Sequence, residues 1–148
     1  MSMSVETSKT MLKVFGIVDI LFGALLLLFS AITLAGGGLL ASGVIPMDPA
    51  EAGVSGALVL VAGGAMLVMG GFSLASGILS RRAAKDPSKA HPAFVFAIIG
   101  LVLAALNLTL ALTGGGSPIS AIVSVAINGL LVVAANTLRK EGAEALAA

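Results

Sequence analysis

Long intervals without charged side chains constrain this chain more than any other feature of its sequence. Three intervals are nearly free of ionisable residues, and they lie between Lys13 and Asp48, between Glu51 and Arg81, and between Lys89 and Arg139. Asp19 is the one ionisable residue inside the first interval, and His91 is the one inside the third. A helix that crosses a bilayer needs about 20 apolar residues. Each of the first two intervals has room for one such helix, whereas the third is interrupted by glycine, serine and proline at 114–118 and has room for two. The sequence therefore predicts four membrane-spanning helices.

The composition agrees with a membrane protein and argues against several other classes. Hydrophobic residues make up 58% of the 148 residues and charged residues only 10%, which leaves too little polar surface for a soluble domain. A net charge of +1 argues against a nucleic-acid partner, because a phosphate-binding surface needs a concentrated basic face. Cysteine is absent and histidine occurs once, so no metal, cofactor or catalytic site is expected. The expected partner is the lipid bilayer.

The predicted fold is an all-α, polytopic four-helix bundle in a single domain of residues 1–148. The expected spans are approximately 11–34, 54–79, 92–112 and 118–138. Proline after a polar residue is expected to start three helices, at Asp48-Pro49, at Asp86-Pro87 or His91-Pro92, and at Ser117-Pro118. Glycine triplets at 36–38 and 114–116 are expected to end the first and third helices. A weak similarity between residues 14–18 and 95–99 is consistent with two tandem helical hairpins.

Two points about the first span stay open at this level. Residues Leu39 to Met47 are apolar and fit either a loop on the membrane surface or a continuation of the first helix. The run from Met11 to Leu34 also has some features of a signal peptide, whose cleavage would leave three spans. The length of this run and the presence of Asp19 inside it favour an intact span.

The basic residues predict the orientation in the membrane. Two precede or begin the first span, four lie in the turn at 80–91, and two follow the fourth span; they are Lys9, Lys13, Arg81, Arg82, Lys85, Lys89, Arg139 and Lys140. The two opposite loops carry only Asp48 and Glu51. This asymmetry predicts that both termini and the basic turn are cytoplasmic, in a multi-pass protein of the cell membrane. The basic turn is also expected to contact lipid headgroups.

Small residues recur every seven positions along each predicted span. The repeats are Gly16, Gly23, Ser30 and Gly37; Gly56, Gly63, Gly70 and Gly77; Ala97, Ala104 and Ala111, with Gly100 and Asn107 between them; and Ala121, Asn128 and Ala135. Lipid gives helices no hydrophobic reason to associate, so close backbone approach over small side chains must hold them together. A seven-residue period predicts left-handed packing at a crossing angle of about 20°. The alternative is that a glycine-rich chain shows such stripes by composition alone.

Asp19, Asn107 and Asn128 are the candidate polar residues inside the spans. At 1.5 Å per residue, Asp19 and Asn128 lie at similar depths of roughly 12 and 15 Å, and we expect them to meet across the bundle near Gly100 and either Gly71 or Ser73. An intramembrane carboxylate either holds a proton or cation or simply joins helices, and both interpretations stay open. Asn107 is expected to form a hydrogen bond between helices.

Two functions are compatible with these patterns. The first is a non-enzymatic accessory or scaffold protein that associates with itself or with a larger membrane protein. The second is a small transporter or ion-conducting protein with Asp19 as its intramembrane proton or cation site.

Four spans and an acid in the first span loosely resemble the small multidrug transporters, whose first-span glutamate binds proton and drug. The chain differs from that family in having Asp19 in place of glutamate, no Trp or Tyr to hold an aromatic cation, and a one-sided charge distribution. These differences argue against drug export.

Overall fold

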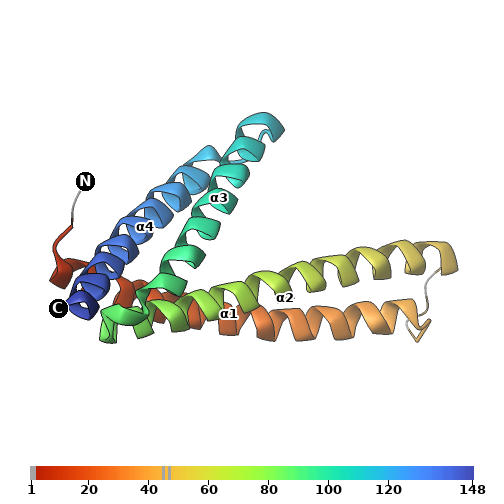
Figure 1. Cartoon of the computed structure of the whole chain (residues 1–148). Coiled ribbons are helices and arrows are strands. Elements are labelled where there is room, and N and C mark those ends of the chain that lie inside the picture. The colour runs from red at the N-terminus through yellow and green to blue at the C-terminus, as the bar shows by residue number, and fades with distance from the viewer. Residues whose placement is uncertain (1–2, 45, 47) are drawn as a thin grey trace. The chain divides into compact units, whose positions relative to one another are not determined.

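The fold is all-α and is built from four long helices (Figure 1). The computed structural model describes residues 3–44, 46 and 48–148. The helices are α1 (Val5–Ala41), α2 (Pro49–Lys85), the short 3-10 helix η1 (Pro87–Lys89), α3 (Ala90–Gly114) and α4 (Pro118–Ala147). Each of the four long helices is long and apolar enough to cross a membrane. The prediction of an all-α chain with four potential membrane spans is therefore confirmed.

The predicted helix starts at Asp48-Pro49 and Ser117-Pro118 are confirmed. Pro49 is the first residue of α2, and Asp48 Oδ1 accepts the Ala50 main-chain N–H at 3.1 Å. This bond satisfies one of the donors that a helix leaves free at its N-terminus. Of the two alternatives for the third helix, Asp86-Pro87 starts η1, and α3 follows from Ala90.

Only one of the two glycine triplets ends a helix. The α3 helix ends at Gly114, and Gly115 follows it with a left-handed φ of +73°. The expectation that residues 36–38 end the first helix is wrong, because α1 continues to Ala41 and the left-handed residue is Gly43, with φ of +74°. A continuous helix satisfies its own backbone hydrogen bonds, which an apolar environment requires. The open question about residues 39–47 is thereby answered up to Ala41, while residues 45 and 47 lie outside the described part of the chain.

The chain divides into two compact units. We call Asp19–Ala75 the hairpin unit, since it contains most of α1 and α2. We call the remainder, residues up to Val18 together with Ser76–Ala148, the four-helix unit, because it contains parts of all four helices. Each unit has its own packing and is described separately.

The hairpin unit is held together by close approach of two helix backbones. Residues at a seven-residue spacing are buried along the contact on both helices, namely Gly23, Ser30, Gly37, Gly56, Gly63 and Gly70. A Cβ atom built at Gly23 would lie 2.6 Å from the Leu74 main-chain nitrogen, so no side chain fits there. The large side chains point outward, as shown by Leu21, Val61 and Val68, which are 62%, 72% and 71% exposed. Small residues therefore form the contact and large apolar residues form the surface.

The four-helix unit has a core in which alanine predominates. Its buried members are Leu12 of α1, Ala83 of α2, Ala90, Ala93 and Ala97 of α3, and Leu131, Ala134, Ala135 and Leu138 of α4. The α3 and α4 helices lie side by side in this unit (Figure 1). Because the core joins the start of α1, the end of α2, the start of α3 and the end of α4, these four helix ends lie at one end of the unit.

All four helices are longer than the predicted spans. The α1 helix begins at Val5, α2 extends to Lys85, and α4 extends through the acidic, alanine-rich tail to Ala147. The tail packs rather than projecting freely: Gly142 is buried, and a Cβ atom built there would overlap the Pro87 carbonyl oxygen of η1. Helix thus continues past the apolar segments into the charged ends.

Candidate functional site

Every Lys and Arg of the chain belongs to the four-helix unit. We call these eight residues the basic end: Lys9, Lys13, Arg81, Arg82, Lys85, Lys89, Arg139 and Lys140. Four of the seven acids belong to the same unit, namely Glu6, Asp86, Glu141 and Glu144. The unit therefore carries a net positive charge, and the core described above brings the charged helix ends together.

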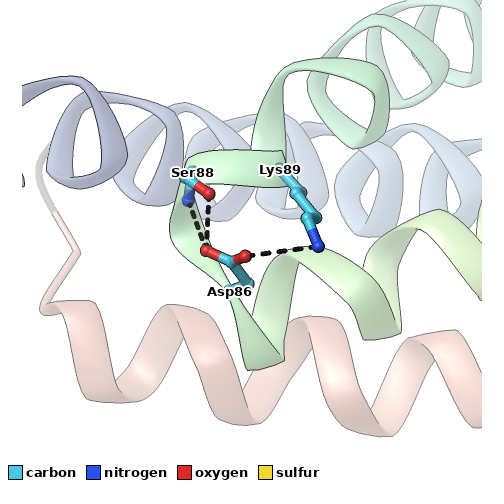
Figure 2. Close-up of polar contacts among 3 residues, drawn as sticks. All are labelled: Asp86, Ser88 and Lys89. Carbon is cyan, nitrogen blue, oxygen red and sulfur yellow. Dashed lines mark hydrogen bonds and ion pairs between the residues drawn. The ribbon is translucent and has the colours of Figure 1, made fainter. Parts of the chain in front are cut away.

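The turn between α2 and α3 is fixed by the carboxylate of Asp86 (Figure 2). Its Oδ1 accepts hydrogen bonds from the Ser88 hydroxyl at 2.6 Å and from the Ser88 main-chain N–H at 3.1 Å. Lys89 Nζ lies 3.5 Å from Oδ2. The pKa of Asp86 lies below its ordinary value chiefly because the Ser88 hydroxyl stabilises the carboxylate. Desolvation is the next largest influence and opposes this shift, while the Ser88 N–H and Lys89 lower the pKa further.

A groove of about 210 Å³ lies between the start of α1 and the end of α2. Its lining is Lys9, Thr10 and Lys13 from α1 and Arg81, Ala84 and Lys85 from α2. We call this the basic groove. In the described residues, the ion pair present joins Lys89 to Asp86, and none of the four cations of the groove takes part in one. The groove therefore concentrates positive charge without a carboxylate to neutralise it.

A second hollow of about 420 Å³ lies beside α4 and differs in character. It is lined by Met3, Val5, Phe94, Val132, Val133, Asn136, Thr137, Lys140, Glu141 and Glu144. Nearby, the guanidinium of Arg139 lies 4.2 Å from the centre of the Phe94 ring and donates a 3.0 Å hydrogen bond to Asn136 Oδ1. Arg139 is thus engaged within the protein, and the hollow is lined by two acids, Glu141 and Glu144, and one cation, Lys140.

The predicted polar residues have separate surroundings. Asp19 is half buried in the hairpin unit, where its main-chain carbonyl oxygen accepts a 3.0 Å hydrogen bond from the Ser73 hydroxyl. Asn128 belongs to the four-helix unit, and its Nδ2 donates a 2.8 Å hydrogen bond to the Ser124 carbonyl oxygen. Because Asp19 and Asn128 belong to different units, their contact stays a prediction. Asn107 is exposed on α3.

The predicted packing glycines lie against neighbouring helices within their units. Gly16, Gly23, Gly56, Gly63, Gly70 and Gly77 are buried. A Cβ atom built at Gly16 would lie 2.9 Å from both the Gly77 carbonyl oxygen and Arg81 Cγ. At Gly100 it would lie 2.6 Å from Asn128 Oδ1, which places the Asn128 amide directly over this glycine.

Two contacts within the four-helix unit were not predicted from the sequence. The pairing of Lys9 and Lys13 with Arg81 and Lys85 was missed, although each pair is four residues apart and so shares a helix face. The contact of Gly142 with η1 was also missed, and an isolated glycine inside a helical segment was its only signal.

Four long apolar helices define this chain as a multi-pass membrane protein. Comparison with protein-family models, with curated proteins and with solved structures found no match. In the part of the chain that the structure describes, no group of three or more His, Cys, Asp or Glu side chains is placed to hold a metal ion.

Proposed function

We propose that this chain is a non-enzymatic scaffold or accessory protein of the cell membrane that associates with a second copy of itself. Its termini and basic end lie on the cytoplasmic side in this proposal, since positively charged loops are retained there. The observation that carries the proposal is an exposed face of α3.

This face combines leucine side chains with one amide. Leu103, Leu106, Asn107 and Leu110 are spaced as neighbours on one side of a helix, and the leucines are 52%, 57% and 68% exposed. The side of α3 that packs within the unit carries Ala93, Ala97 and Ala104, which are buried. The face is therefore left over after α3 has packed within its own unit.

The amide supports a second copy as the occupant of this face. An Asn side chain has both a donor and an acceptor, so two copies of Asn107 related by a two-fold axis satisfy each other. Hydrogen bonds of this kind between membrane helices are worth roughly 0.6 to 2 kcal/mol, whereas lipid offers the amide no partner.

The small-residue faces of α1 and α2 are already occupied inside the molecule. Gly63 and Gly70 lie against Leu34 and Leu26 of the same chain, so their replacement by leucine tests the hairpin rather than self-association. The leucine face of α3 is the surface to test.

Single-cysteine cross-linking in membranes tests the proposal, because the natural chain contains no cysteine. Leu106→Cys is expected to form disulfide-linked dimers, whereas Leu112→Cys, 66% exposed but on another side of α3, is expected not to. Adding Asn107→Leu to Leu106→Cys should lower the dimer yield roughly three- to thirtyfold.

Three results would contradict the proposal. They are equal cross-linking at positions 106 and 112, no dimer at position 106, or a yield that Asn107→Leu leaves unchanged. Ion flux into proteoliposomes that Asp19→Asn abolishes would instead favour the transport function.

A further inference from the structure

The geometry points to the basic groove as a binding site for the phosphate headgroup of one anionic phospholipid. The groove lies where the charged ends of α1 and α2 meet the apolar segments of the same helices. Its ligand chemistry follows from the side chains that line it and from the surface next to it.

The lining provides the groups that bind a phosphate. Arg81 presents a planar set of N–H donors that matches two phosphate oxygens, and Lys9, Lys13 and Lys85 add three ammonium charges. Thr10 contributes a hydroxyl, and the small side chain of Ala84 leaves room between the cations. A volume of about 210 Å³ suits a headgroup rather than a large organic ligand.

Glycine brings the cations of the two helices into one groove. Gly16 and Gly77 are buried where α1 meets α2, and any Cβ at Gly16 would meet Arg81 Cγ at 2.9 Å. The stem of Arg81 therefore lies against the α1 backbone, next to the turn that carries Lys13. A larger residue at position 16 would move the two sets of cations apart.

Apolar surface beside the groove favours a lipid over a free phosphate ion. Ile17 follows Lys13 by four residues, and Ile78 precedes Arg81 by three, so each isoleucine lies on a cation-bearing face one turn further into the apolar segment. Ile17 is 40% exposed and Ile78 is 42% exposed. These side chains are placed to contact the acyl chains of a lipid, whereas a soluble anion has no apolar part to contact them. Basic pockets between membrane helices commonly bind phospholipid headgroups.

Lipid titration of the purified full-length protein tests this site. Phosphatidylglycerol is titrated into the protein in detergent and bound lipid is counted by native mass spectrometry, with phosphatidylcholine and inorganic phosphate as parallel probes. The double variant Lys13→Gln/Arg81→Gln removes two groove cations. The matched control Arg82→Gln/Lys89→Gln removes the same number of charges from residues outside the groove. It removes the Lys89–Asp86 ion pair but keeps both Ser88 hydrogen bonds to Asp86.

The expected result is one preferentially bound phosphatidylglycerol in the natural protein. Its affinity should fall roughly thirtyfold in Lys13→Gln/Arg81→Gln and less than about threefold in the control. The charge-conserving variant Lys13→Arg/Arg81→Lys should retain most of the binding. Should the first double variant fail to fold, Lys85→Gln at the exposed end of α2 should still lower the affinity about fivefold, against no change in Arg82→Gln.

Two outcomes would overturn the inference. Equal losses in the groove variant and its control would show diffuse surface attraction rather than a site. Displacement of phosphatidylglycerol by inorganic phosphate at an equal concentration would assign the groove to a soluble anion. Neither outcome bears on cross-linking through α3, so this inference and the self-association proposal are tested independently.

Discussion

The hydroxyl of Ser30 donates a 2.7 Å hydrogen bond to the main-chain carbonyl oxygen of Gly63, across the contact between α1 and α2. Both residues are buried, and Ser30 is fully inaccessible. The two helices approach closely at Gly63, because a Cβ there would lie 2.8 Å from the Leu34 side chain. Ser30 and Gly63 thus show how the hairpin unit combines close backbones with polar contacts.

Replacing Ser30 by alanine is expected to destabilise the hairpin unit. Ser30→Ala removes one buried interhelical bond, which should lower the free energy of unfolding by about 0.5 to 1.5 kcal/mol. Ser8 is the matched control, because its side chain is equally buried yet its hydroxyl has no hydrogen-bond partner in the described residues. Ser8→Ala should therefore cost nothing or slightly stabilise the protein. Denaturant unfolding in detergent micelles measures the free energy of unfolding of both variants. Equal decreases in the two variants would show that the hydrogen bond is not the cause of the destabilisation.

Even the smallest substitution at Gly23 should destabilise the protein. A Cβ there would lie 2.6 Å from the Leu74 nitrogen and 2.8 Å from the Gly70 carbonyl oxygen, and neither backbone atom can move without moving α2. We expect Gly23→Ala to lower the free energy of unfolding by about 1 to 3 kcal/mol.

Gly36→Ala on the same helix is its control, since nothing lies within 4 Å of a Cβ at Gly36. Alanine is a better helix former, so this variant should be neutral or stabilising by up to about 1 kcal/mol. Similar behaviour of the two variants in thermal unfolding would contradict the close contact at Gly23.

The seven-residue spacing of small residues coincides with the buried edges of α1 and α2. The two coincide because closely packed helices need small side chains wherever their backbones meet. The positions of small residues can be read from a single sequence. The same pattern does not reveal whether a glycine ends a helix or packs within it. Residues 36–38 and 114–116 are both glycine triplets, yet only the second ends a helix. The first triplet lies within α1 instead, where a Cβ atom built at Gly37 would lie 3.1 Å from Leu60 Cγ. That difference depends on what lies opposite, which the local sequence does not contain.

The basic residues were predictable as helix ends but not as a groove. Their spacing places Lys9 with Lys13 and Arg81 with Lys85 on single helix faces. Bringing both faces together requires the antiparallel register set by Gly16 and Gly77, a long-range property. A search for cation pairs four residues apart at the ends of successive spans would have suggested it.

The pKa of Asp86 should depend most on Ser88. The carboxylate is stabilised in its charged form, so it contributes to stability at neutral pH, and this contribution is lost at acidic pH as the carboxylate is protonated on passing through its lowered pKa. Ser88→Ala should raise the pKa of Asp86 toward its ordinary value more than Lys89→Gln does, because the Ser88 hydroxyl is the largest cause of the shift. Carboxyl carbon NMR during a pH titration gives both values, and a larger shift in Lys89→Gln would contradict the hydrogen-bond explanation.

The α4 helix should tolerate substitution at one glycine and not at another. Gly142 is buried against η1, where a Cβ would lie 2.8 Å from Ser88 Cα and would overlap the Pro87 carbonyl oxygen. Both neighbours are backbone atoms of the turn that Asp86 fixes, so they have little freedom to move. Gly142→Ala should therefore lower the free energy of unfolding by about 1 to 3 kcal/mol, despite the better helix propensity of alanine.

Gly129 on the same helix provides the comparison, because a Cβ there meets nothing within 4 Å. Gly129→Ala should keep the full propensity gain of about 0.5 to 1 kcal/mol. Limited proteolysis at the turn gives a second readout, since Gly142→Ala is expected to expose residues 86–89 to cleavage while Gly129→Ala leaves them protected. If Gly142→Ala were as stable and as resistant as Gly129→Ala, the terminal helix would not be packed on η1, because this close backbone contact leaves no space for a methyl group.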